Sequence, residues 1–133
     1  MSCFHRVHPI LCILTLITVI SVNADIKKDC RKQSQVSWAS LKQLRTGNFD
    51  EDDQNLKCYL RCFMARNGIL NNKNEIDVER ALRNLPQSVQ ETSKKLLLRC
   101  KDVESDDSCN KAFQIAKCFV KMQPEILRDV PFV

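Results

Sequence analysis

Residues 56–64 read Leu56-Lys57-Cys58-Tyr59-Leu60-Arg61-Cys62-Phe63-Met64. The apolar residues of this stretch recur with the period of an α-helix, and Cys58 and Cys62 are one helical turn apart. Both sulfur atoms therefore leave the same face of one helix. Because the helix holds the two backbones in place, the cysteines could bond each other only through a distorted turn. We expect each to reach a different neighbouring element, so that this helix is fastened from two sides.

The first 24 residues are predicted to be a secretory signal peptide. Residues 10–22 form an uncharged apolar run, and Val22-Asn23-Ala24 offers small residues at the usual cleavage spacing. The alternative is an uncleaved membrane anchor, but the run is shorter than the roughly 20 residues that span a bilayer as a helix. The sequence therefore predicts a secreted, extracellular protein without stable membrane insertion. Its single domain would cover residues 25–133.

Removing residues 1–24 changes the residues available for chemistry. Both histidines of the sequence are lost, which excludes Ser-His, Cys-His and histidine–metal sites. No general acid or base stands out, so we predict no enzyme, no cofactor and no metal site. Arg6 is lost as well, leaving 20 Lys and Arg against 16 Asp and Glu, a net charge of +4. That charge is ordinary for solubility and does not predict a nucleic-acid partner.

Six of the eight cysteines remain, an even number that in a small secreted chain predicts three disulfides. Fifteen pairings are possible, and the count alone does not choose among them. The six are Cys30, Cys58, Cys62, Cys100, Cys109 and Cys118.

The apolar pattern predicts an all-α fold of five or six helices. We expect the first helix over residues 25–45 with Trp38 facing inward, and a capping box at Ser88 and Glu91 before a later one. The mature chain contains only two glycines, which argues against a turn-rich β-fold. The further helices are expected over residues 51–66, 75–85, 88–103 and 109–122.

The cysteine spacing leads to a family. Between successive cysteines lie 27, 3, 37, 8 and 8 residues. This pattern resembles the insect odorant-binding proteins of the pheromone-binding and general odorant-binding group, over essentially the whole chain. The local sequences that carry the resemblance are Lys57-Cys58-Tyr59-Leu60-Arg61-Cys62 and Asp107-Ser108-Cys109-Asn110-Lys111-Ala112.

The resemblance implies helices fastened by three interlocked disulfides around an apolar cavity. The implied pairs are Cys30–Cys62, Cys58–Cys109 and Cys100–Cys118. Apolar helix faces are usually plain core, but crosslinks can hold helices around a cavity that would otherwise collapse. We expect the pocket walls among the apolar faces of the predicted helices, and the C-terminal Phe132 and Val133 to cap the ligand. The expected wall residues are Leu56, Leu60, Met64, Ile76, Leu82, Val89, Leu96, Phe113, Ala116 and Phe119.

The resemblance further implies a carrier of small hydrophobic molecules, odorants or pheromones, in an extracellular fluid such as sensillum lymph. A chemosensory receptor is then a further expected partner. Since the mature chain has no histidine, any pH-driven release must use carboxylates and occur at lower pH.

Two other functions remain open for such a helical chain. The main alternative is a secreted interaction or defence protein of the venom or salivary type, which would have a filled interior. A saposin-like lipid-surface protein would need exposed amphipathic faces and a different cysteine order. Chemosensory proteins of the four-cysteine kind are excluded by the count of six.

Overall fold

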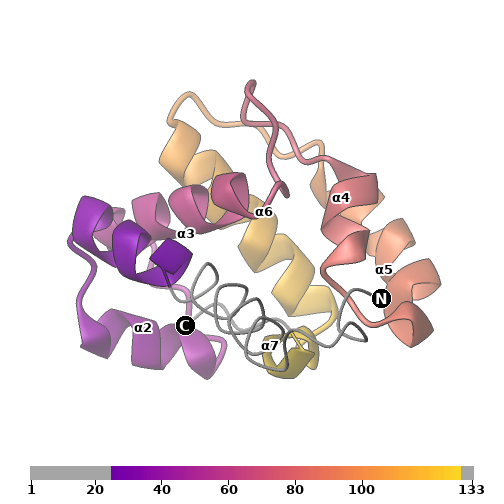
Figure 1. Ribbon diagram of the computed structural model, residues 1–133, viewed down its shortest axis with the longest axis horizontal. Helices are drawn as coiled ribbons and strands as arrows, with labels where there is room; N and C mark the ends of the chain where they lie inside the picture. The colour runs from indigo at the N-terminus through magenta and orange to yellow at the C-terminus, as the bar shows by residue number, and fades with distance from the viewer. Residues whose placement is uncertain (1–24, 130–133) are drawn as a thin grey trace, which may run out of the picture.

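The all-α prediction is confirmed by the computed structural model, which describes residues 25–129 (Figure 1). The predicted leader and residues 130–133, with Phe132 and Val133, lie outside the described residues. Between residues 25 and 129 the only β-contact is an isolated bridge between Leu70 and Ile76. The helical segments are 25–34, α2 (Trp38–Arg45), α3 (Gln54–Arg66), α4 (Val78–Arg83), α5 (Gln87–Cys100), α6 (Ser108–Met122) and α7 (Ile126–Asp129).

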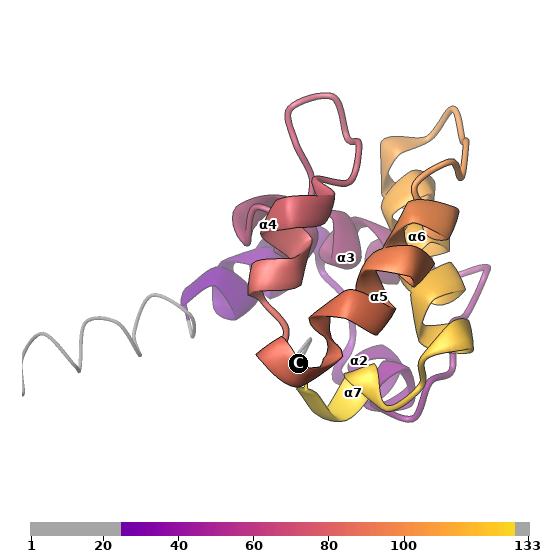
Figure 2. The ribbon, with the colours of Figure 1, turned by 90° about the vertical axis from the view of Figure 1, so that its right-hand side faces the viewer.

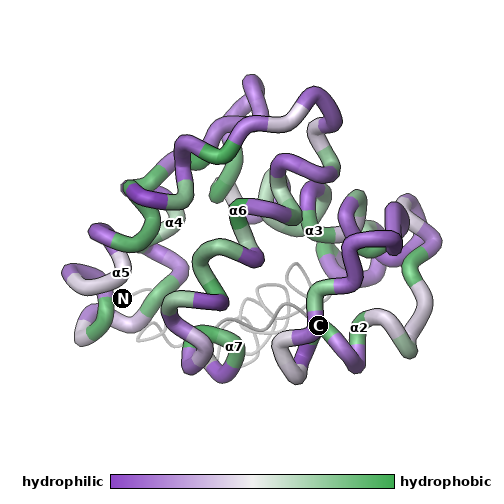
Figure 3. Tube along the Cα trace, turned by 180° about the vertical axis from the view of Figure 1, so that it is seen from behind, coloured by the Kyte–Doolittle hydropathy of each residue, from purple (hydrophilic) through white to green (hydrophobic). Residues whose placement is uncertain are grey.

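The long helix α6 lies between α3 and α5 and packs against both (Figure 1). Hydrophobic residues recur along α6, as the green segments of Figure 3 show, and Phe113 and Ile115 are fully buried. Leu56, Tyr59 and Leu60 supply the matching face of α3. Helices α4 and α5 lie side by side on the other flank of α6 (Figure 2). Helices α3, α4, α5 and α6 thus enclose the core from different directions.

The single first helix predicted over residues 25–45 is wrong. The chain breaks at Gln35, which has a φ of 58°, and Ser37 then caps α2 by accepting a hydrogen bond from the Ser40 N–H at 3.0 Å. A serine that can bond nearby backbone groups favours such a start over a continuous helix. The break rotates Trp38 outward, so that it is 66% exposed with the Arg31 guanidinium 4.5 Å from its ring centre.

Aspartates begin three of the other helices. The side chains of Asp53, Asp77 and Asp107 each accept a backbone N–H in the first turn of α3, α4 and α6. A carboxylate there satisfies an otherwise unpaired donor and opposes the positive end of the helix dipole.

The capping box predicted at Ser88 and Glu91 is wrong, because α5 begins at Gln87 directly after Pro86 without a side-chain cap. Proline suits this position, since its ring fixes φ near the helical value. The helix count exceeds five or six because the first predicted helix is split in two and α7 forms after Pro124.

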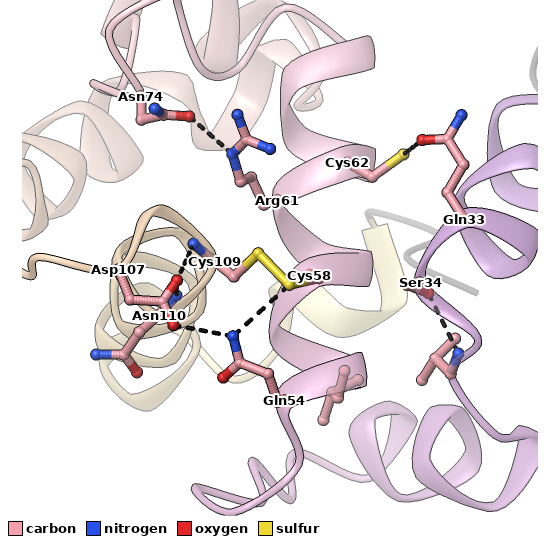
Figure 4. Close-up of a disulfide and its surroundings, with 12 residues drawn as sticks. Gln33, Ser34, Gln54, Cys58, Arg61, Cys62, Asn74, Asp107, Cys109 and Asn110 are labelled. Carbon is pink, nitrogen blue, oxygen red and sulfur yellow. Dashed lines mark hydrogen bonds between the residues drawn. A yellow bond between two sulfur atoms is a disulfide. The ribbon is translucent and has the colours of Figure 1, made fainter.

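Helix α3 is fastened from two sides, as its two cysteines predict. Cys62 bonds Cys30 of the first helical segment, with 5.6 Å between the Cα atoms. Cys58, one turn earlier, bonds Cys109 at the start of α6, with 4.6 Å between the Cα atoms (Figure 4). The third disulfide joins α5 to α6 through Cys100 and Cys118. These are the pairs that the family resemblance implies.

The disulfides should differ in their effect on stability, because they close loops of different length. The separations of 51 residues for Cys58–Cys109 and 18 for Cys100–Cys118 predict losses of about 4 and about 3 kcal/mol in the free energy of unfolding. Guanidinium unfolding of the paired Cys→Ala variants would measure this, with Cys30→Ala/Cys62→Ala expected between them. A reversed order would mean that loop entropy does not set the ranking.

Candidate functional site

A small apolar cavity lies between α3, α4, α5 and α6, with a volume of about 50 Å³. We call it the interior cavity. Helix α6 contributes most to its wall, through Ile115, Ala116 and Phe119, which share one face at helical spacing. The other lining residues are Met64 of α3, Ala81 of α4, Leu97 of α5, and Ile69, Ile76, Asn84 and Leu85 of the connecting segments.

Two alanines explain why space remains here. Ala81 of α4 and Ala116 of α6 both line the interior cavity, and neither side chain extends beyond Cβ. Larger residues around them hold the helices apart. Met64, an unbranched and adaptable side chain, forms part of the same wall.

The structure brings four of the predicted wall residues together at the interior cavity: Met64, Ile76, Ala116 and Phe119. The other predicted residues lie elsewhere in the core. Of these, Val89 and Leu96 of α5 are half-buried at its edge. The remainder are buried but do not line the cavity: Leu56, Leu60, Leu82 and Phe113.

Sequence reasoning missed six of the lining residues. The prediction placed Leu96 rather than Leu97 in the cavity wall. Because adjacent side chains on a helix point about 100° apart, only one of these two leucines faces the cavity. Ile69 lies in a connecting segment, and Asn84 and Leu85 lie beyond the end of α4, although the helix predicted over residues 75–85 included both. Ala81 and Ile115 belong to faces that the pattern did predict as apolar.

Asn84 is the only polar residue in the wall of the interior cavity, within the described part of the chain. Its amide donates a hydrogen bond to the Arg80 carbonyl at 3.1 Å, and its side chain is exposed. The cavity therefore reaches the surface beside the α4–α5 connection. An apolar interior with one polar edge suits a ligand that is mostly hydrocarbon.

A second, larger depression is open to solvent and is lined by charged as well as apolar residues. It is an open surface groove of about 810 Å³ between the ends of α2 and α6 and the start of α7. Arg45, Lys117, Lys121, Glu125 and Arg128 are among its lining residues. Charged groups on an open face remain hydrated, so the groove gains little from an apolar molecule. The interior cavity is the better candidate for such a ligand.

Polar contacts fasten α3 to α6, the two helices that contribute four of the ten lining residues. Glu51, just before α3, accepts hydrogen bonds from Gln114 and Lys117 of α6, the former at 2.8 Å. Asp107, at the start of α6, accepts one from Gln54 of α3 at 2.9 Å (Figure 4). The pKa of Glu51 is lowered mainly by the Lys117 hydrogen bond, and the pKa of Asp107 is lowered mainly by the Gln54 hydrogen bond. Both carboxylates therefore favour the folded state while ionised.

The arrangement defines a class of protein: a disulfide-fastened helical fold around an apolar interior. Comparison with known proteins gives the family. The model of the PBP/GOBP family matches residues 20–122. Odorant-binding protein 10 of Aedes aegypti is 28% identical over 100 residues, which are 74% of this chain and 71% of that protein. The chain belongs to the PBP/GOBP family, a family of odorant-binding carriers rather than enzymes.

Solved structures agree with this fold. A Locusta migratoria odorant-binding protein superposes with a TM-score of 0.70 at 26% identity, covering 84% of this chain and 86% of that one. A fatty acid binding protein, OBP56a, from the oral disk of the blowfly Phormia regina gives 0.64 at 26% identity, covering 81% and 94%. Across residues 25–129, the structure contains no helix with the length and apolarity needed to cross a membrane.

The Glu51 contacts predict a specific acid sensitivity. A carboxylate whose pKa is lowered on folding stabilises the folded state at pH values above its unfolded pKa. This stabilisation is lost as the pH falls through the pKa of the folded state, which for Glu51 lies below the usual 4.5. Glu51→Gln should lower the Tm at pH 7 by about 1–4 °C, as for an exposed ion pair, and by less at pH 3. Thermal unfolding followed by circular dichroism measures this. The exposed Glu104→Gln is the control, and an equal loss at both pH values would contradict the argument.

Proposed function

We propose that this protein is a secreted carrier that binds small hydrophobic molecules in its interior cavity and transports them through an extracellular fluid such as sensillum lymph. The observation that carries the proposal is an uncharged cavity enclosed by helices that disulfides join. The leader over residues 1–24 would direct secretion and be removed. The carrier would then deliver its ligand to a chemosensory receptor.

The size of the interior cavity limits how a ligand binds. About 50 Å³ is far below the roughly 300–1,000 Å³ of pockets for drug-sized ligands. A ligand of odorant size must therefore displace wall side chains. Met64 can adapt by rotation about its flexible bonds. The three disulfides keep the helices joined while the wall moves, so that opening the cavity need not unfold the domain.

The solved structure of one relative supports an aliphatic ligand. The blowfly protein is described as binding fatty acids, and its fold covers 81% of this chain. In the present chain, the ten cavity residues carry no charge. We therefore propose a ligand with a substantial hydrocarbon portion.

The proposal is tested by titrating the oxidised protein, secreted from its full-length sequence, with an environment-sensitive apolar fluorophore. Saturable binding that is lost on reduction, and displaced by linear alcohols or esters, is the expected result. Mass spectrometry of the same sample should give Asp25 as the first residue. A folded, disulfide-bonded protein without saturable binding would contradict the carrier function and favour the interaction or defence protein.

Filling the interior cavity should block the ligand. Ala116→Leu places a larger side chain in the wall, and we expect ligand affinity to fall at least about tenfold while the fold is kept. Ala65→Leu makes the same change at an exposed position of α3 and should leave affinity unchanged. Fluorophore displacement measures both variants. If the two variants bind alike, the ligand occupies another site.

Binding should be nearly constant between pH 7.5 and 5.5. Residues 25–133 contain no histidine, and burial raises the pKa of Tyr59 to about 12, so its hydroxyl stays neutral. The lowered pKa of Glu51 and Asp107 keeps both carboxylates ionised through this range. The dissociation constant across the range is the measurement. A release midpoint near pH 6.5 would contradict the argument.

A further inference from the structure

A buried polar pair joins α5 to the end of α6. The Ser93 hydroxyl of α5 donates a hydrogen bond of 2.9 Å to the side-chain oxygen of Gln123, the residue that ends α6. Ser93 is 0% exposed and Gln123 only 4%. A neutral hydrogen bond of this kind contributes modestly to stability, and two apolar side chains of similar shape could replace it at little cost. Stability alone therefore gives little reason for a polar pair here.

The pair continues the wall of the interior cavity. Ser93 is one helical turn before Leu97 on α5, and Gln123 is one turn after Phe119 on α6; both Leu97 and Phe119 line the cavity. One turn of a helix rises about 5.4 Å, so the polar pair lies about one turn away from the apolar residues of the wall. Asn84 marks the exposed edge. The polar pair thus borders the apolar wall of the cavity without lining it.

We propose that the interior cavity extends to Ser93 and Gln123 when a ligand binds, and that the pair recognises a hydroxyl group at the end of an aliphatic chain. The inference rests on the proposed carrier function and names the polar group of its ligand. The hydroxyl enters between the two side chains. It accepts the Ser93 hydrogen bond and donates its own to the Gln123 oxygen.

The donor and acceptor pattern selects the hydroxyl over other groups. A hydroxyl both donates and accepts, so both side chains keep a partner after insertion. A ketone can accept from Ser93 but has no hydrogen for the Gln123 oxygen. A carboxylate would carry its charge into a cavity whose ten lining residues are uncharged, which is costly without a cation. The expected ligand is therefore a neutral long-chain alcohol, not a fatty acid.

Four eight-carbon probes test the proposal on the full oxidised protein: n-octanol, methyl hexyl ketone, n-octane and octanoate. The main variant is Ser93→Ala/Gln123→Leu, which removes both polar partners and leaves neither one unpaired. We expect its affinity for octanol to fall about three- to tenfold, and its affinity for octane to change less than twofold. Ser88→Ala, on the exposed side of α5, is the matched control and should change neither.

A second measurement uses the unaltered protein and so does not depend on a variant folding. The Gln123 side-chain amide resonances, assigned by their loss in Gln123→Leu, should shift on addition of octanol and stay in place with octane. Equal effects of the variant on octanol and octane, unmoved amide resonances with octanol, or octanoate binding more tightly than octanol would each overturn the inference. If no probe binds the unaltered protein at all, the carrier function fails as well.

Discussion

The structure depends on helix α3 being held by two disulfides, one helical turn apart, that lead to two different neighbours (Figure 4). Cys62 joins it to the first helical segment and Cys58 to the start of α6. Because a helix fixes the direction of its side chains, the positions of both partners follow from the spacing of two residues. Glu51 and Asp107 then add polar contacts beside the second bond. The α3–α6 pair is thus the firmest part of the molecule.

The opposite wall of the cavity is held differently. Helix α4, Val78–Arg83, contains no cysteine, and only Cys100–Cys118 joins its neighbour α5 to α6. The segment before α4 is closed by backbone hydrogen bonds, including Asp77 N–H to the Ile69 carbonyl at 2.7 Å. Arg61 of α3 adds one side-chain bond to Asn74 at 2.9 Å. Packing and such local contacts yield more readily than disulfides, so expansion of the cavity should occur on the α4 side.

Cysteine spacing and helical period predicted the features that rest on regular geometry. They gave the all-α class and the inward faces of α3 and α6, and the family resemblance implied the pairing of the cysteines. They failed where local chemistry interrupts the period. Ser37 capped a new helix inside a predicted one, and that break turned Trp38 to the solvent. The cavity was harder still to predict. Four of its ten lining residues lie outside the helices, and a fifth depends on which of two adjacent leucines of α5 faces inward.

The Ser93–Gln123 bond shows why an apolar pattern search is a poor guide to binding chemistry. Such a search looks for hydrophobic residues and treats a buried serine or glutamine as an interruption. Inside a low-dielectric core, however, a polar group is costly unless it is paired, so its presence there is more informative than another leucine. Gln123 also ends α6 and accepts the N–H of Ile126 at the start of α7, at 3.1 Å. Its side chain therefore lies at a junction whose backbone is independently fixed, and an exchange of its hydrogen-bond partner need not disturb either helix.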